Sequence, residues 1–264
     1  MAERAGRLGR GFPKDRAALV CYLMAGYPDR ATSLLAVRAA VSAGADVVEL
    51  GVPYADPLAD GPVIAQAAKA ARAAEGGFGL AETIGLARET ALSPDAVAGV
   101  PIALMTYFNP MLKFGLSRLA NEALEAGVSG FIVPDLPPDS AGEWLAVSPD
   151  LDTVFLAAPT STPERLALVG SSSRGFVYCV STTGVTGERS ELPSGIDALV
   201  ARVKAATTLP VAVGFGVSTP AQAAALARIA DGVVVGSALV RLQADPAALG
   251  SFVAELASAV REPA

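Results

Sequence analysis

The sequence predicts an α/β fold, and specifically a single (β/α)8 barrel domain over residues 1–264. Eight short apolar runs, rich in β-branched residues, alternate with segments in which apolar residues recur at helical spacing. The apolar runs are continuous rather than alternating, as is typical of parallel strands covered on both faces. Eight such pairs of elements in 264 residues fit one barrel. The expected strands are 19–24, 47–51, 102–105, 130–133, 153–157, 175–180, 210–214 and 232–236.

The segments between the expected strands carry signals for helix starts. Thr162 and Thr219 each precede a proline, which places a capping side chain before a proline at the first helical position. Gln222 follows Thr219 by three residues, the spacing of a capping box. Residues 1–16 are expected to form a helical or flexible extension ahead of the first strand. The expected helices are 33–42, 63–74, 80–91, 117–126, 163–170, 195–206 and 220–229.

A doubly wound open sheet is the alternative architecture for the same order of elements. The junctions at 43–48, 126–131 and 230–234 share one pattern. In each, a small residue ends a helix, a glycine or an acid forms the turn, and an apolar strand follows. This repetition indicates a recurring strand and helix unit. No Gly-x-Gly-x-x-Gly turn follows the first strand, which favours the barrel.

The composition restricts the possible functions. The net charge is −6, which argues against a nucleic-acid-binding protein, since these usually carry a basic face. The chain has no histidine, so acid–base chemistry falls to other side chains and histidine-bound metals are excluded. Cys21 and Cys179 lie in separate apolar runs and are expected to be reduced core thiols. No apolar run is long enough for a membrane helix, and we expect a cytoplasmic protein without membrane contact.

The second expected strand carries an acid, and the loop after it carries two more. Glu49 lies between Val48 and Leu50 near the end of the strand, where desolvation raises the pKa of a carboxyl group. Asp60 lies on the proline-rich loop and can fold back opposite Glu49, so these two form the expected acid–base pair. The alternative is that Glu49 caps a helix or pairs with a buried base, while Asp56 and Asp60 are solvated loop acids.

Glycine turns follow the seventh and eighth expected strands, at Gly214-x-Gly216 and at Gly236-Ser237. In a barrel these two strand ends are neighbours, and their backbone N–H groups can bind a phosphate. No lysine or arginine is adjacent, so such a site relies on amides and suits a phosphate carried on an organic substrate. A purely structural role for the glycines is the alternative.

Three further features remain open from the residues alone. Asp135 follows the fourth strand and is a third acid–base candidate, for which a helix cap or turn is the simpler interpretation. The polar loop 182–192 follows the sixth strand and is either a mobile lid or a surface loop. The acids at 49, 56 and 60 lack the spacing of a calcium loop, and we expect no metal site.

The run from Glu49 to Pro62, ELGVPYADPLADGP, resembles the signature of the tryptophan synthase alpha chain family. The resemblance covers roughly residues 17–260 and implies a TIM barrel. It implies a lyase of tryptophan biosynthesis that cleaves indole-3-glycerol phosphate to indole and D-glyceraldehyde 3-phosphate in a retro-aldol step. The other matching motifs are AGYPD at 25–29, LMTYFNP at 104–110, VPDLP at 133–137, APTS at 158–161, GVTG at 184–187, GFG at 214–216 and GSA at 236–238.

The resemblance also assigns roles to individual residues. It implies that Glu49 is the general acid and base, that Asp60 holds the indole N–H, and that Thr186 bonds the loop aspartate when the lid closes. The residues that correspond to the family's indole pocket are Tyr22, Leu104, Tyr107, Ile132, Pro134 and Tyr178. The implied phosphate site consists of Gly187, Phe215, Gly216, Gly236 and Ser237.

The resemblance implies a partner as well. Family members pass indole through a tunnel to a beta chain that contains pyridoxal phosphate (PLP), within an allosteric α2β2 heterotetramer. Asp56, Pro57 and the loop after the third strand are similar to the family's contact surface with that chain. The alpha chain itself is expected to hold no PLP, metal or nucleotide.

The chain departs mildly from the family pattern. Tyr22 stands where some members have Phe, Pro134 stands where some have Ala, and 181–183 lacks an arginine that some members show. Two alternative activities stay open, a stand-alone lyase that releases free indole and another phosphate-binding barrel enzyme. A non-catalytic barrel that activates a partner is the third alternative, and the intact pair of Glu49 and Asp60 argues against it.

Overall fold

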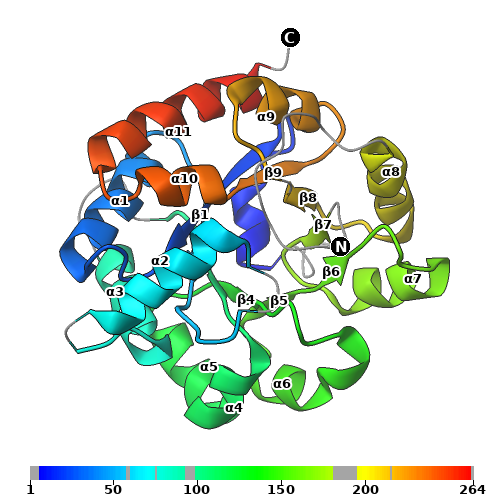
Figure 1. Cartoon of the computed structure of the whole chain (residues 1–264). Coiled ribbons are helices and arrows are strands. Elements are labelled where there is room, and N and C mark those ends of the chain that lie inside the picture. The colour runs from blue at the N-terminus through cyan, green and yellow to red at the C-terminus, as the bar shows by residue number, and fades with distance from the viewer. Residues whose placement is uncertain are drawn as a thin grey trace.

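Nine parallel strands form one sheet that curves into a barrel in the computed structural model (Figure 1). The structure describes residues 6–57, 60–74, 76–92, 99–180, 195–214 and 216–262. The strand order is β5-β4-β3-β2-β1-β9-β8-β7-β6, so the first and second strands lie in the middle of the sheet. The strands are β1 (Ala18–Met24), β2 (Val47–Gly51), β3 (Ile102–Met105), β4 (Gly130–Ile132), β5 (Asp152–Val154), β6 (Leu156–Ala157), β7 (Val177–Val180), β8 (Val211–Gly214) and β9 (Gly232–Val235).

The two end strands of this sheet, β5 and β6, are consecutive in the chain and separated only by Phe155. β5 pairs with β4, whereas β6 pairs with β7. The carbonyl oxygen of Phe155 accepts a hydrogen bond from the N–H of Tyr178 at 3.1 Å, which continues the ladder across the break. The two short strands therefore occupy one position, and the sheet closes with eight positions. This confirms the predicted (β/α)8 barrel.

Helices surround the strands on the outside of the barrel (Figure 1). All seven expected helices are present, with ends that differ by up to three residues from the predicted ones. The further helices α4, α6, α10 and α11 were not among those expected. The helices are α1 (Arg30–Ser42), α2 (Pro62–Ala73), α3 (Leu80–Ala91), α4 (Phe108–Phe114), α5 (Leu116–Glu125), α6 (Gly142–Val147), α7 (Pro163–Ser172), α8 (Ile196–Ala206), α9 (Pro220–Ala227), α10 (Ser237–Leu242) and α11 (Pro246–Arg261).

The predicted helix caps are confirmed. The hydroxyl of Thr162 accepts from the N–H of Arg165 at 3.3 Å. Thr219 accepts from the N–H of Gln222 at 3.3 Å, and the Gln222 side chain accepts from Thr219 in return, which completes the capping box. These caps fix where the helices after β6 and β8 begin.

The core has an inner and an outer layer because side chains alternate along each strand. On β1, Cys21 and Leu23 belong to the outer cluster between the strands and the helices. Val20 and Tyr22 belong to the second cluster, which fills the barrel interior. All four are buried. An inward-facing strand position near the carboxyl end of the barrel is therefore where a functional side chain can meet a substrate.

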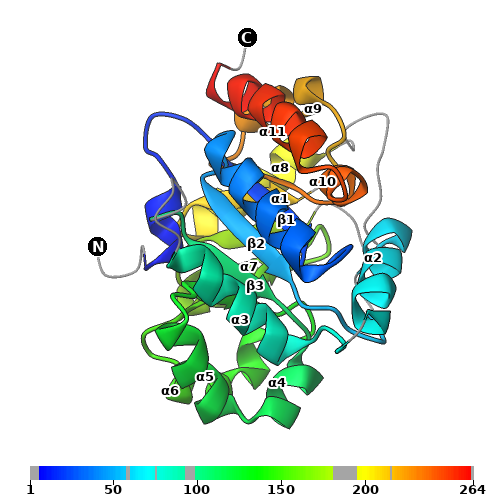
Figure 2. The same ribbon diagram turned by 90° about the vertical axis from the view of Figure 1, so that its left-hand side faces the viewer.

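The N-terminal segment packs into the barrel at the amino ends of the strands, opposite α2 (Figure 2). Within the range predicted as a helical or flexible extension, it forms the short 3-10 helix η2 (Leu8–Gly11). The N–H of Leu8 donates to the buried carboxylate of Asp152 at 2.7 Å. The rings of Phe12 and Phe176 lie 5.0 Å apart inside the interior cluster. Buried Leu8 and Phe12 thus fill that end of the barrel.

The cysteines and the lengths of the helices were also predicted from the sequence. Cys21 and Cys179 are both buried and free, and their burial confirms the predicted place in the core. Within the described ranges, no helix has the length and apolar character needed to cross a bilayer.

Candidate active site

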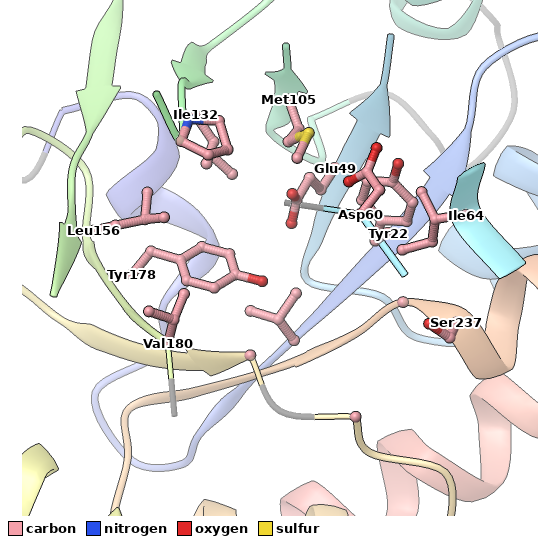
Figure 3. Close-up of a pocket in the computed structure, with 15 residues that line it drawn as sticks. Tyr22, Glu49, Asp60, Ile64, Met105, Ile132, Leu156, Tyr178, Val180 and Ser237 are labelled. Atoms are coloured by element: carbon pink, nitrogen blue, oxygen red, sulfur yellow. The ribbon is translucent and has the colours of Figure 1, made fainter. Parts of the chain in front are cut away.

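A cavity opens at the carboxyl ends of the strands, and both expected catalytic acids line it (Figure 3). Its walls come from strands on all sides of the barrel and from the first turn of α2. Most of the lining is apolar or aromatic, and two carboxyl groups and a few hydroxyls are the polar exceptions. The lining residues are Tyr22, Glu49, Asp60, Ile64, Met105, Ile132, Pro134, Leu156, Tyr178, Val180, Gly214, Gly216, Val234, Gly236 and Ser237.

Glu49 points into the cavity from the middle of β2. Its neighbours Val48 and Leu50 face the outer cluster, so alternation turns Glu49 inward. Only 2% of its surface is exposed, and its Oε2 atom has no hydrogen-bond partner among the described residues. Burial, with a smaller contribution from the charge of Asp60, raises the pKa of Glu49 to about 8. Near neutral pH, Glu49 therefore carries a proton that it can donate.

Asp60 lies just before α2 and reaches the same cavity from the loop (Figure 3). Burial raises its pKa to about 6, although a hydrogen bond from Tyr107 lowers it. Asp60 is therefore largely ionised at pH values where Glu49 is protonated. Two carboxyl groups whose environments separate their pKa values are typical of an acid–base site with distinct roles for each.

Tyr107 lies behind Asp60 rather than in the wall of the cavity. It is buried and bonds to Asp60, whereas the resemblance placed it in the indole pocket. Its ring packs on Tyr54 with 5.2 Å between the centroids. Asn109 Nδ2 in turn donates to the Tyr54 hydroxyl at 3.1 Å. Tyr107 is thus held by the loops after β2 and β3 and positions the Asp60 carboxylate.

Leu104 does not line the cavity, in contrast to the role implied by the resemblance. It is fully buried in the outer cluster, against the helices. The next residue, Met105, takes the inward position on β3 and lines the cavity. The reason is the period of two along a strand, which makes neighbouring residues face opposite sides. Of the other implied indole-pocket residues, the structure places Tyr22, Ile132, Pro134 and Tyr178 in the lining.

The two predicted glycine turns lie side by side at one end of the cavity. β8 and β9 pair in parallel with Gly214 opposite Val234, and Gly216, Gly236 and Ser237 all line the cavity. Gly214 also has a packing reason to be glycine, because a Cβ there would lie 2.2 Å from the Tyr178 hydroxyl oxygen. No lysine or arginine lines this cavity in the described part of the chain, so backbone amides and side-chain hydroxyls are the donors available. The expected residues Thr186, Gly187 and Phe215, and the loop 182–192, lie outside the described residues.

Sequence reasoning missed several apolar members of the lining. Met105 and Val234 could have been found from the inward phase of their strands, since they share it with Glu49. Leu156 begins β6 and Val180 ends β7, and Ile64 comes from the first turn of α2. Ile64 carried no signal in the sequence, because its approach depends on how α2 packs against the barrel.

The remaining acids take other places. Asp135 Oδ1 accepts from the N–H of Phe108 at 2.9 Å, at the start of α4, which agrees with the simpler interpretation as a cap. Asp56 is exposed on the loop before Asp60, and Pro57 beside it is half-buried. Across the described positions there is no group of three or more side chains suited to hold a metal ion.

Comparison with known proteins gives a consistent assignment. The family model described as tryptophan synthase alpha chain matches residues 11–261. The tryptophan synthase alpha chain of Mycobacterium tuberculosis strain H37Rv is 47% identical over 266 residues, covering 98% of this chain and 96% of its own. The relative from Mycobacterium marinum is also 47% identical, over 267 residues, with 98% and 97% of the two chains covered.

Solved structures agree with the sequence matches. A chain of M. tuberculosis tryptophan synthase superposes with a TM-score of 0.89 at 46% identity, covering 97% of this chain and 99% of the other. The alpha subunit of tryptophan synthase from Legionella pneumophila strain Paris gives a TM-score of 0.86 at 31% identity, with 97% and 98% covered. With matches in sequence and in fold along nearly its whole length, the chain belongs to the tryptophan synthase alpha chain family.

Proposed function

We propose that this chain is a lyase that cleaves indole-3-glycerol phosphate to indole and D-glyceraldehyde 3-phosphate. The observation that carries the proposal is the pair of carboxyl groups in one largely apolar cavity, Glu49 with a pKa of about 8 and Asp60 with a pKa of about 6. Breaking the bond between the indole ring and the glycerol chain requires one proton donor and one fixed negative charge, and this pair supplies both.

In this mechanism Glu49 performs both proton transfers. Its protonated carboxyl group delivers a proton to C3 of the indole ring, which makes the ring an electron acceptor. The C–C bond then breaks and its electron pair returns to the ring, while the hydroxyl on the departing carbon becomes an aldehyde. The Glu49 carboxylate takes the proton of that hydroxyl, which restores the starting state of the enzyme. The raised pKa of Glu49, caused by burial, suits both steps near neutral pH.

Asp60 stabilises the positive charge that develops on the ring. Protonation at C3 places positive charge on the indole nitrogen, and a carboxylate that accepts the indole N–H stabilises that state more than the neutral ring. The hydrogen bond from Tyr107 favours the ionised form of Asp60 needed for this role. The apolar lining, including Met105 and Ile132, excludes water and suits the face of the indole ring.

The phosphate end of the substrate is proposed to lie against Gly216, Gly236 and Ser237. These residues line the cavity beside the ends of β8 and β9, where backbone N–H groups and the Ser237 hydroxyl can donate to phosphate oxygens. The resemblance to the family adds Gly187 and Phe215 to this site and implies that Thr186 bonds Asp60 when the site closes. These three assignments rest on the motifs alone.

The partner proposed for this chain is a tryptophan synthase beta chain, in an α2β2 assembly that passes indole on for tryptophan synthesis. The PLP of that reaction belongs to the beta chain, and this chain needs no cofactor for the cleavage. The proposed contact with the beta chain is the segment with Asp56 and Pro57, which comes shortly before the cavity residue Asp60 in the chain. A cytoplasmic location is part of the proposal and is supported by the two free thiols.

The test is an assay of indole release by the purified chain, alone and with a beta chain. We expect slow cleavage alone and much faster cleavage with the partner, and fast cleavage without it would favour a stand-alone lyase. Glu49→Gln should lower kcat by about 10³-fold, because the amide cannot transfer the proton. Asp60→Asn should lower kcat by about 10²-fold, because the charge at the ring nitrogen is lost. Full activity of Glu49→Gln with an unchanged circular dichroism spectrum would refute the assignment.

A further inference from the structure

Two polar atoms in the cavity are buried without a hydrogen-bond partner among the described residues. One is Glu49 Oε2, which the mechanism uses, and the other is the hydroxyl oxygen of Tyr22. Tyr22 has 4% of its surface exposed and lines the same cavity. A buried hydroxyl usually finds a partner, so an unpartnered one that lines a substrate cavity points to a partner on the ligand.

Tyr22 lines the cavity together with Glu49 and Asp60 (Figure 3). Tyr22 is the register partner of Glu49 on the neighbouring strand, so both side chains face the interior. Its ring begins beside Gly236, where a Cβ would lie 3.7 Å from Tyr22 Cβ and Cδ1. Its hydroxyl ends over Gly51, where a Cβ would lie 2.0 Å from the hydroxyl oxygen. The side chain therefore runs from the glycine turn proposed for the phosphate to the strand of Glu49.

The surroundings of Tyr22 keep its hydroxyl protonated. Burial raises its pKa well above the ordinary value, and the charges of Asp60 and Glu49 raise it further. The other titratable groups that act on it are the hydroxyls of Tyr107 and Tyr178, which also raise its pKa. Tyr22 is therefore a neutral O–H group at working pH, able to donate one hydrogen bond.

We propose that Tyr22 is a substrate-positioning residue whose hydroxyl donates a hydrogen bond to an oxygen of the three-carbon chain of indole-3-glycerol phosphate. This inference rests on the proposed function. The chain must cross from the Gly236 turn to Glu49, and the Tyr22 side chain covers the same interval. The indole ring and the phosphate have other partners, so the hydroxyls of the chain are the groups left for Tyr22. Such a bond holds the hydroxyl that Glu49 deprotonates in a fixed orientation.

The test compares Tyr22→Phe with the natural chain, each assembled with a beta chain, on two ligands. Indole-3-glycerol phosphate has the chain hydroxyls, whereas indole-3-propanol phosphate has the same ring and phosphate without them. We expect kcat/KM for cleavage to fall about tenfold in Tyr22→Phe, the effect of one lost hydrogen bond in the transition state. The Kd of indole-3-propanol phosphate should change less than about twofold, because that ligand offers nothing to the hydroxyl.

Tyr27→Phe is the matched control, because Tyr27 follows the same strand but does not line the cavity. It should leave kcat/KM and Kd unchanged, and circular dichroism should show that both variants fold. An unchanged kcat/KM in Tyr22→Phe would overturn the inference. A loss of affinity for indole-3-propanol phosphate as large as the loss in kcat/KM would also overturn it, because the hydroxyl would then act through the protein and not through the hydroxyls of the substrate. If the natural chain fails to cleave the substrate at all, the proposed function falls and this inference falls with it.

Discussion

The Tyr107 side chain hydrogen-bonds to Asp60, and this bond lowers the pKa of a carboxyl group that burial would otherwise raise further. Tyr107 is itself fixed by its ring contact with Tyr54 on the loop after β2. The ionised state of Asp60 therefore depends on a residue that does not touch the cavity. Two loops that come from different strands meet at this point, so a change in either of them reaches the carboxylate.

Removing the Tyr107 hydroxyl should shift the pH dependence of cleavage. In Tyr107→Phe the pKa of Asp60 rises above about 6, because the bond that favours the carboxylate is lost while burial stays. We expect kcat/KM at pH 6 to fall roughly threefold to tenfold, with a smaller loss at pH 8, where Asp60 is ionised in both proteins. The measurement is the pH profile of kcat/KM with the beta chain present. An equal loss at every pH would mean that Tyr107 acts only on packing.

Glu49 should make the protein less stable as the pH rises. Its pKa is about 8 in the folded protein against an ordinary value of 4.5, so the folded state binds the proton more tightly than the unfolded state. The stabilisation is fully present below about pH 4.5 and is lost as the pH rises through about 8. Glu49→Gln removes this dependence, and its free energy of unfolding should exceed that of the natural chain by on the order of 5 kcal/mol at pH 9, with a difference of less than about 1 kcal/mol at pH 5.

Urea denaturation at the two pH values measures the effect of Glu49→Gln. Glu122→Gln is the control, because it removes an exposed carboxylate that pairs with Arg118 on the surface of α5. That variant should show no gain of stability at pH 9. A Glu49→Gln protein that is no more stable than the natural chain at pH 9 would contradict the assignment of a protonated Glu49.

Gln243 should contribute strongly to stability although it lies outside the cavity. Its buried amide accepts from the N–H of Met24 at 2.9 Å and donates to the carbonyl oxygens of Met24 and Tyr27, both at 2.7 Å. Gln243→Met keeps the size but removes all three hydrogen bonds, although the Met24 carbonyl still accepts from the N–H of Tyr27 at 3.3 Å. The loss should lower the free energy of unfolding by about 2–4 kcal/mol. The exposed Gln66→Met is the control and should change it by less than about 0.5 kcal/mol in urea denaturation. Equal free energies of unfolding for both variants would show that the hydrogen bonds of Gln243 contribute no net stability.

The strands could be predicted well because their signal is local. The run 47–51 is apolar apart from Glu49 and is bounded by turn residues, and β2 has those bounds in the structure. The sequence around Phe155 does not show that the fifth expected strand divides into β5 and β6. That division depends on pairing, since β5 pairs with β4 and β6 pairs with β7. α6 and α10 have six residues each, too few for a helical period to be visible in the sequence.

The site was harder to predict at single-residue precision. Glu49 and Asp60 were found because an acid in an apolar strand and a nearby proline-rich acidic loop are unusual, and both line the cavity. Leu104 and Met105 are both apolar, so only the phase of β3 relative to its neighbours decides which one faces inward. The unpartnered Tyr22 hydroxyl became visible only in three dimensions, since its distance to other polar groups is not written in the sequence.

The N-terminal segment fills the barrel at the amino ends of the strands. Leu8 and Phe12 fill the interior at the amino ends of the strands, and Asp152 holds the backbone of Leu8 there. The cavity that Glu49 and Asp60 line lies at the other end of the barrel, at the carboxyl ends of the strands. With the amino end filled by Leu8 and Phe12, a protein that receives the product directly is expected to bind over the carboxyl end, where it would also control the entry of the next substrate.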